Sequence, residues 1–234
     1  MYVIEQCSSA GEFTGTIAVP DSTSWLSGIA ASTVHNCLYA AAHQSTQLHR
    51  VSLTSATHTV WYVPKWPAGL SVTPAEEILV CCVDKALILA LCPLTGNRLP
   101  VLPVFELGIT KPWHAVCMAS GMLAVSATGP CPSVWLLGQD FSVKSWYGTF
   151  GTGTGQLRSR RCLLPWGIGP ENENCVLVCD RENNRIVAID FTRSMSRVLV
   201  SDICGPCGIA VDIANRSLFV GEWAGNKRVL TYTY

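Results

Sequence analysis

The fold is decided by the stretch LLPWGIGPENENCVLVCDRENNRIVAID, which runs from Leu163 to Asp190. A second copy, GPCGIAVDIANRSLFVGEWAGNKRVLTY, begins at Gly205. In each copy a Gly-Ile pair opens an apolar run of strand length, an acidic residue follows, and an Asn-containing turn leads into another β-rich run. Self-similarity of this kind is typical of repeat architectures, so we interpret the chain as a repeat protein.

Weaker copies of the opening lie further back in the chain. With the two clear copies, the anchor residues recur at steps of 41 to 53 residues, at Gly28, Gly69, His114, Gly167 and Gly208. A period of about 40 to 50 residues is that of one four-stranded propeller blade. The sequence therefore predicts an all-β β-propeller with five recognisable blades, over about residues 24–62, 66–110, 111–163, 164–203 and 204–234.

Residues 1–23 lie outside these blades and contain two predicted strands, at residues 2–6 and 16–19. We expect these strands to complete the C-terminal blade, because closing the ring removes exposed sheet edges. The alternative is that the chain is a fragment of a six-bladed ring, whose sixth blade lacks its inner half. Residues 1–234 are in either case expected to form a single propeller domain.

Composition limits the function. The chain of 234 residues has 16 basic and 16 acidic side chains, so bulk charge excludes a strongly basic nucleic-acid binder but not a local basic patch. The apolar runs are too short to span a bilayer, and the N-terminus does not resemble a signal peptide, so we expect no membrane association and a cytoplasmic location. Most of the 12 cysteines are expected to be buried, reduced hydrophobic residues.

The clearest copies resemble NHL repeats. The match consists of Gly167-Ile168, Asp180 and Asn184-Arg185-Ile186 in one copy, and of Gly208-Ile209, Glu222 and Arg228 in the other. The resemblance covers residues 148–234 clearly and residues 24–110 weakly. The chain departs from the NHL pattern at two acidic positions. Glu222 replaces the usual Asp in the last blade, and Ala42 occupies the position at which the first blade would carry an acidic residue.

The resemblance implies structural roles for the best-matched polar residues. A carboxylate at a strand end can accept hydrogen bonds from the following turn, and an arginine in the next strand can pair with it. We therefore expect Asp180 with Arg185, and Glu222 with Arg228, to hold strands of one blade together.

The cysteines and histidines offer only weak evidence for a redox, metal or catalytic site. Cys204 and Cys207 have the spacing of the thioredoxin dithiol. A redox dithiol of that type lies at the N-terminus of a helix, which lowers the thiol pKa, but here a strand of the repeat is predicted to follow the two cysteines. A zinc site would need two further ligands in the right geometry. Of the histidines, only His114 occupies a blade opening beside the channel. We therefore expect no catalytic residue, no metal and no cofactor.

The tryptophans lie close to the blade openings. Loops at corresponding ends of the blades meet on one face of a propeller, where aromatic and Arg-rich rims bind proteins. The alternative is that these tryptophans pack between blades as core. The predicted partner-binding rim consists of Trp66, Trp113, Trp166, Arg181, Trp223 and Lys227.

We interpret the chain as a non-enzymatic NHL-type propeller that acts as a protein-interaction scaffold. The first alternative is RNA binding through a local basic rim, because some NHL domains bind RNA on a basic face. The second is a metal-dependent propeller hydrolase or lyase, since propellers host all three functions. The residues predicted for RNA binding are Arg158, Arg160, Arg161, Arg181 and Lys227.

Overall fold

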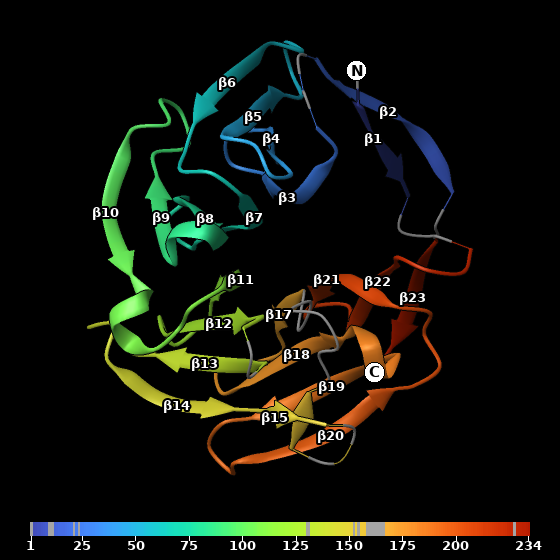
Figure 1. Cartoon of the computed structure of the whole chain (residues 1–234). Coiled ribbons are helices and arrows are strands. Elements are labelled where there is room, and N and C mark those ends of the chain that lie inside the picture. Colours follow the sequence, from blue (N-terminus) through green and yellow to red (C-terminus); the bar gives the residue numbers. More distant parts are fainter. Residues whose placement is uncertain are drawn as a thin grey trace.

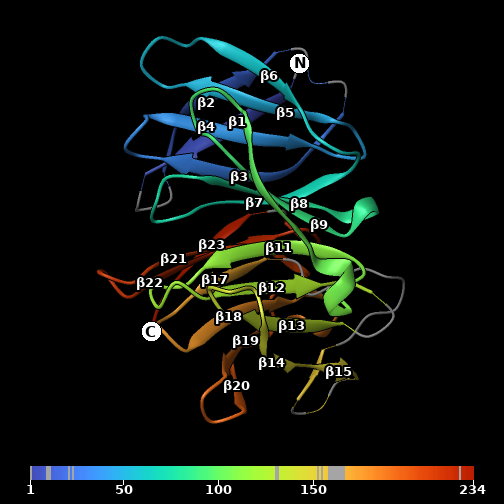
Figure 2. The same cartoon turned by 90° about the vertical axis from the view of Figure 1, so that its left-hand side faces the viewer.

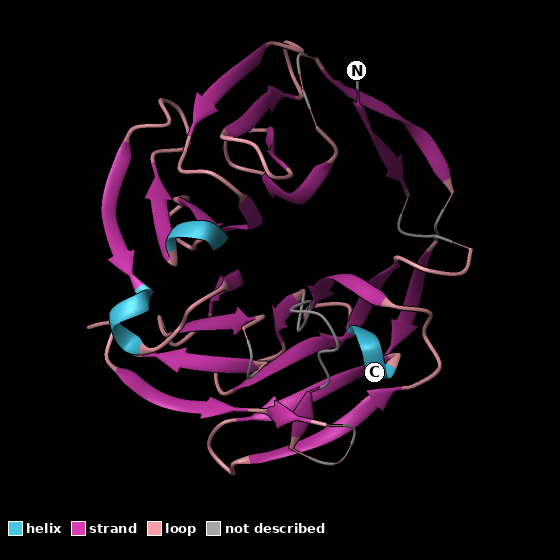
Figure 3. Cartoon of the chain, viewed as in Figure 1, coloured by secondary structure: helices cyan, strands magenta, loops and turns pink. Residues whose placement is uncertain are grey.

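The computed structural model describes residues 2–8, 12–20, 22, 24–129, 132–151, 153, 155–157, 167–226 and 228–234. It is an all-β ring of five blades, as predicted, with four blades of four strands and one of three (Figure 1). Within the described residues, helix is limited to three 3₁₀ turns, at Val83–Lys85, Val104–Leu107 and Arg181–Asn183 (Figure 3). No helix in the described part of the chain is long and apolar enough to cross a membrane.

Each blade is an antiparallel meander whose first strand lies nearest the centre of the ring (Figure 1). The first blade contains β3 (Leu26–Ser32), β4 (Cys37–Ala42), β5 (Gln47–Ser52) and β6 (His58–Tyr62). The second contains β7 (Pro67–Val72), β8 (Ile78–Cys82), β9 (Leu87–Leu91) and β10 (Arg98–Pro103). The third contains β11 (Pro112–Cys117), β12 (Leu123–Ala127), β13 (Ser133–Leu137) and β14 (Val143–Tyr147).

The fourth and fifth blades come from the two clearest repeats. The fourth contains β17 (Ile168–Pro170), β18 (Cys175–Asp180), β19 (Arg185–Asp190) and β20 (Met195–Val200). The fifth has only β21 (Pro206–Asp212), β22 (Ser217–Glu222) and β23 (Val229–Thr233). A small parallel sheet, β15 (Thr149–Phe150) with β16 (Gln156–Leu157), lies between the third and fourth blades in the chain.

The N-terminal strands, β1 (Tyr2–Cys7) and β2 (Phe13–Val19), form a two-stranded sheet of their own. This hairpin lies beside the first blade, on the side away from β7–β10 (Figures 1 and 2). It pairs with neither β23 nor β3, so the expected completion of the last blade by these strands is not what the structure shows. The hairpin instead lies where the ring has its gap, between the first and fifth blades (Figure 1).

Apolar clusters join successive blades. Leu48 and Leu89 belong to the cluster between the first and second blades, and Val134 and Val187 to the one between the third and fourth. Equivalent clusters join the second to the third blade and the fourth to the fifth. In the described residues no such cluster joins the fifth blade back to the first. The ring is therefore packed through four interfaces and open at the fifth.

The space around the anchor glycines also differs between the packed interfaces and the open one. A Cβ atom added to Gly28 would lie 2.1 Å from the Ala68 carbonyl oxygen, and one added to Gly69 would lie 2.5 Å from that of Trp113. A Cβ atom added to Gly208 would meet no heavy atom within 4 Å. Glycine at the first two positions is thus required by the close approach of neighbouring inner strands, whereas β21 has open space on the side facing β3.

The acidic residues of the repeat lie at the ends of the second strands. Asp180 is fully buried, and its Oδ2 accepts hydrogen bonds of 2.7 Å from both Arg185 Nε and Asn183 Nδ2. Glu222 Oε2 accepts one of 3.0 Å from Arg228 Nε, while its Oε1 accepts one from the Cys204 backbone N–H. Asp180 thus contacts the turn and strand that follow it, whereas Glu222 contacts the turn before β23 and the loop before β21, and both sets of contacts suit a structural role.

Candidate functional site

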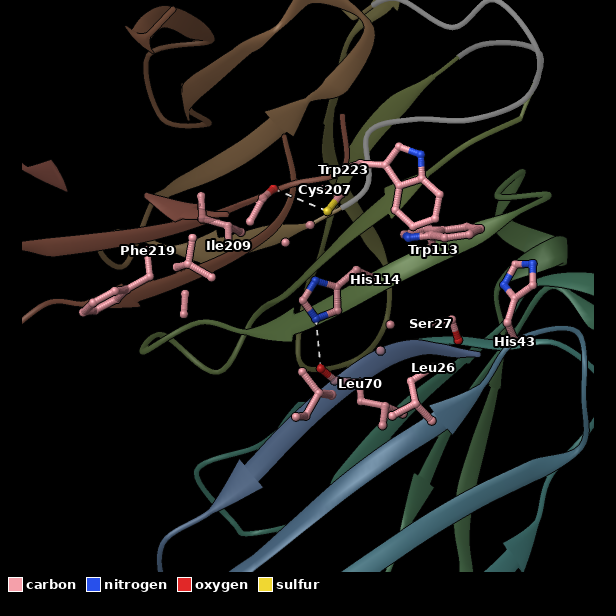
Figure 4. A pocket seen from close by; sticks show the side chains of 18 of the residues that line it. Leu26, Ser27, His43, Leu70, Trp113, His114, Cys207, Ile209, Phe219 and Trp223 are labelled. Atoms are coloured by element: carbon pink, nitrogen blue, oxygen red, sulfur yellow. Dashed lines mark hydrogen bonds between the residues drawn. The ribbon is translucent and has the colours of Figure 1, made fainter. Parts of the chain in front are cut away.

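A cavity of about 430 Å³ opens at the centre of the ring and extends into the gap between β21 and β3 (Figure 4). Its size is in the range of small-molecule sites, about 300 to 1,000 Å³. Its walls come from the first strands of all blades but the fourth, from Gly167 just before β17, and from β22, the start of β23 and the loops at one rim. The lining residues include Leu26, Ile29, Leu70, Trp113, Ile209 and Phe219.

Among the residues that the structure describes, the lining carries no acidic or basic residue apart from histidine. Its side chains with polar atoms other than tryptophan are those of Ser27, His43, His114 and Cys207. A wall of this composition favours an apolar ligand without formal charge, because a charged group would lose its hydration and gain no partner.

His114 is a structural residue in this wall. Its Nδ1 accepts a hydrogen bond of 3.2 Å from the Ile168 backbone N–H, so the ring proton sits on Nε2, which donates to the Leu70 carbonyl oxygen at 3.0 Å. The ring thereby connects the second, third and fourth blades. Burial lowers the pKa of His114 below its usual 6.5, so the imidazole is neutral and both nitrogens are occupied.

Ser27 and Cys207 are also engaged with backbone. Ser27 Oγ donates to the Pro67 carbonyl oxygen at 2.9 Å, and Cys207 Sγ donates to that of Gly221 at 3.4 Å. Burial raises the pKa of the Cys207 thiol, which keeps it protonated. In the described part of the chain neither side chain hydrogen-bonds to a base that would activate it as a nucleophile.

His43 differs from the other polar groups of the pocket. It directly follows β4, and its ring packs edge-to-face against Trp25 at 4.8 Å and Trp66 at 5.4 Å between centroids. Burial lowers its pKa below 6.5, so the imidazole is neutral at pH 7. Its ring nitrogens make no hydrogen bond to any residue that the structure describes. His43 is therefore available as a proton acceptor.

His43 belongs to a continuous aromatic arc on one rim of the ring. Trp113 contacts Trp66, Trp66 contacts His43, His43 contacts Trp25, and Trp25 contacts Trp223 at 5.5 Å across the gap in the ring. The Arg181 guanidinium lies over the Trp223 ring, 5.3 Å from its centroid. Such edge-to-face and cation–π contacts fix the side chains that border the pocket.

Four residues of the predicted rim are thus brought together, namely Trp66, Trp113, Arg181 and Trp223. The other two, Trp166 and Lys227, lie outside the described residues, as do Arg158, Arg160 and Arg161 of the predicted RNA site. Of that basic group the structure describes Arg181 alone, so RNA binding stays a prediction.

His43 was missed because no motif surrounds it. The repeat nevertheless contained a signal, since His43, Arg181 and Trp223 each follow the last residue of the second strand of their blade. Backbone hydrogen bonds confirm the equivalence: the His43 N–H donates to the Trp25 carbonyl and the Trp223 N–H to that of Gly205. Comparing this position across all blades would have identified His43.

A channel metal is not supported by these residues. Among the described parts of the chain, no group of three or more His, Cys, Asp or Glu side chains could hold a metal ion. The histidine expected beside the channel, His114, has both nitrogens bonded to backbone. The donor set does not fit a metal, and we derive no step through one.

Similar solved structures are β-propellers. Hydrazine synthase from Kuenenia stuttgartiensis is 11% identical with a TM-score of 0.69, over 99% of this chain and 89% of that chain. Virginiamycin B lyase from Staphylococcus aureus is 13% identical with a TM-score of 0.67, over 99% and 77%. A streptogramin B lyase is 14% identical with a TM-score of 0.62, over 100% and 87%. No family model and no curated protein sequence matches the chain.

At these identities the likeness establishes a shared β-propeller fold. The neighbours are enzymes, and one further structure is a catalytically inactive histidine-to-alanine variant of the Staphylococcus aureus lyase with quinupristin. These findings contradict the prediction of a non-enzymatic protein-interaction scaffold. The physical reason lies in the pocket, which the repeat pattern did not reveal because it forms only where the ring is open. Of the predicted alternatives, the metal-dependent propeller hydrolase or lyase fits these neighbours better in being an enzyme, although the described residues contain no group that could hold the metal.

Proposed function

We propose that this protein is a propeller lyase that holds an apolar small molecule in the central pocket and uses His43 as its base. The observation that carries the proposal is a neutral imidazole, without a hydrogen-bond partner in the described residues, at the border of an apolar cavity. The lyases of similar fold, one of them inactive as a histidine variant, support the same reaction class.

We also propose that the propeller is of the NHL type. The support is the contact of Asp180 with Arg185 and of Glu222 with Arg228, at equivalent places in two blades.

The chemistry follows from what an elimination requires. A base removes a proton from carbon, the electron pair of that bond forms a double bond, and the leaving group departs with its own electron pair. Neutral His43 would accept the proton, and the apolar wall would exclude water from the reacting carbon. The Trp25 and Trp66 rings hold the imidazole in place, so the proton acceptor has a fixed position relative to the bound molecule.

Blocking the pocket tests this function. We expect Gly208→Leu to fill the cavity, because this residue lines it and has open space around its missing side chain. Binding of the uncharged fluorescent probe N-phenyl-1-naphthylamine, measured by titration, should weaken at least tenfold, or by about 1.4 kcal/mol. Quinupristin is the first compound to screen as a substrate. If the wild type turns it over, Gly208→Leu should lower kcat/KM for quinupristin together with the affinity for the probe.

Gly208→Ala is the matched control. It adds only one methyl group at the same position, and it should bind the probe within about threefold of the wild type, or about 0.7 kcal/mol. Equal affinity of the wild type and the folded Gly208→Leu variant would contradict a ligand site in this pocket.

A further inference from the structure

One position at the rim recurs directly before the first strand of successive blades. In the first blade it is Trp25, whose carbonyl oxygen accepts a hydrogen bond of 2.7 Å from the His43 N–H. In the third blade the Lys111 carbonyl oxygen accepts the equivalent bond, of 2.9 Å, from the Thr128 N–H. Trp66 holds this position in the second blade. Lys111 therefore stands where the two preceding blades have a tryptophan of the aromatic arc.

The Lys111 ammonium is a positive charge beside the mouth of the pocket. The residue is half-buried, and it forms no ion pair with any residue that the structure describes. Trp113, two residues further along the chain, lines the pocket and contacts Trp66 of the aromatic arc. Lys111 itself does not line the pocket, so its charge lies outside the apolar wall.

A second cation of the rim, Arg181, comes from the fourth blade. Its guanidinium lies over the ring of Trp223, which lines the pocket. Gly205 is the equivalent of Lys111 in the fifth blade, because its carbonyl oxygen accepts a hydrogen bond from the Trp223 N–H. A Cβ atom added to Gly205 would lie 3.7 Å from Arg181 Nε. The arginine therefore lies in the space that a side chain at this rim position would take.

The two cations border the same end of the pocket. Trp113, Trp223 and His43 lie together at that end (Figure 4). Lys111 lies two residues before Trp113, and Arg181 covers Trp223. The third and fourth blades, which supply the two cations, are neighbours in the ring (Figure 1). An acidic group at this end would lie close to both positive charges.

The turns of this rim also contain three acidic residues, Asp84, Glu106 and Glu182. Asp84 and Glu106 are exposed, and none of the three forms an ion pair with Lys111. Glu182 adjoins Arg181 and offsets part of its charge. The whole chain has 16 basic and 16 acidic residues. Attraction of an anion therefore depends on the local position of Lys111 and Arg181 and not on net charge.

We propose that the molecule held in the central pocket is an amphipathic organic acid, with an apolar body inside the cavity and one acidic group at the rim beside Lys111 and Arg181. This inference rests on the function proposed above and adds the charge of the substrate. Inside the apolar wall an acidic group would lose its hydration without gaining a partner. At the rim it stays partly in water and gains charge-assisted hydrogen bonds from the two cations.

Two fluorescent probes of the same skeleton test the requirement for a charge. 8-Anilinonaphthalene-1-sulfonate is N-phenyl-1-naphthylamine with one added sulfonate, which stands in for the acidic group. Gly208→Leu should weaken the binding of both probes about tenfold, because both occupy the pocket. Lys111→Gln and Arg181→Gln should each weaken binding of the sulfonate about threefold, and the double variant about tenfold, as expected of charge pairs at a partly exposed site. Lys111→Gln should leave the affinity for the uncharged probe within about twofold of the wild type.

Two variants are matched controls. Lys111→Arg keeps the positive charge and should bind the sulfonate within about twofold of the wild type. Lys144→Gln removes the same charge from β14, the outer strand of the same blade, and should leave the affinity for both probes unchanged. Affinity for the uncharged probe also reports whether each variant is folded.

Three results would overturn the proposal: a double variant that binds the sulfonate as tightly as the wild type does, a Lys111→Gln variant that loses affinity for both probes equally, or a Gly208→Leu variant that loses affinity for the uncharged probe alone. In the first and third cases the pocket still binds an uncharged molecule, and the proposed function stands without the acidic group. If Gly208→Leu does not weaken binding of the uncharged probe, the proposed function itself is contradicted.

Discussion

His43→Gln is expected to reduce kcat/KM by at least a hundredfold while leaving the fold intact. A positioned general base contributes about 10² to 10⁴ in rate, and glutamine keeps the size and polarity of the side chain without accepting a proton. The side chain lies at the surface of the cavity rather than inside a blade, so the substitution creates no buried cavity. Steady-state kinetics on the substrate found by the quinupristin-led screen measure the effect.

The pH profile provides a second readout of the same residue. Because burial lowers the pKa of His43 below 6.5, the neutral form dominates above that pH and activity should be constant there. As pH falls through the lowered pKa, the imidazole binds a proton and kcat/KM should fall about tenfold per pH unit. This acid limb should be absent from the residual activity of His43→Gln.

His35→Gln is a suitable control, because His35 lies in a turn of the first blade and does not line the pocket. It should keep wild-type kinetics. Activity of His43→Gln within threefold of the wild type would rule out His43 as the base.

The second large effect concerns stability. Gly28→Ala should lower the free energy of unfolding by about 3 kcal/mol, at the upper end of the usual cost of overpacking. The added Cβ would lie 2.1 Å from the Ala68 carbonyl oxygen, so β3 and β7 must separate. Urea denaturation followed by tryptophan fluorescence measures the change.

Gly208→Ala is the comparison at the equivalent position of the fifth blade. Its Cβ meets nothing within 4 Å, and its free energy of unfolding should stay within about 0.5 kcal/mol of the wild type. If the two substitutions cost the same, the ring would not be open between β21 and β3, and the pocket would not have the shape described above.

Much of the fold follows from the repeat in the sequence. Gly28, Gly69 and Gly167 lie where the backbones of neighbouring blades approach one another closely, Gly208 occupies the same place in the repeat, and the period of these anchors gives the number of blades. The gap in the ring could not be predicted in this way. Gly208 has the same local sequence signal as Gly28, and only the spatial neighbour of each strand distinguishes a packed glycine from an open one.

The site was harder to predict than the fold for the same reason. The sequence predicts that the tryptophans share one rim because they adjoin blade openings, but the pocket depends on contacts between the first and last blades, such as that of Trp25 with Trp223. His114 was singled out by its position beside the channel, and its hydrogen bonds to Leu70 and Ile168 show that it is structural.

The most direct test of a small-molecule site in the open interface is a crystal structure of the protein with a bound compound, either N-phenyl-1-naphthylamine or a substrate from the screen. We predict electron density for either compound between β3 and β21, in contact with Phe219. A bound substrate should in addition lie within hydrogen-bond distance of His43. Density at another place, with this pocket left without the compound, would contradict the account.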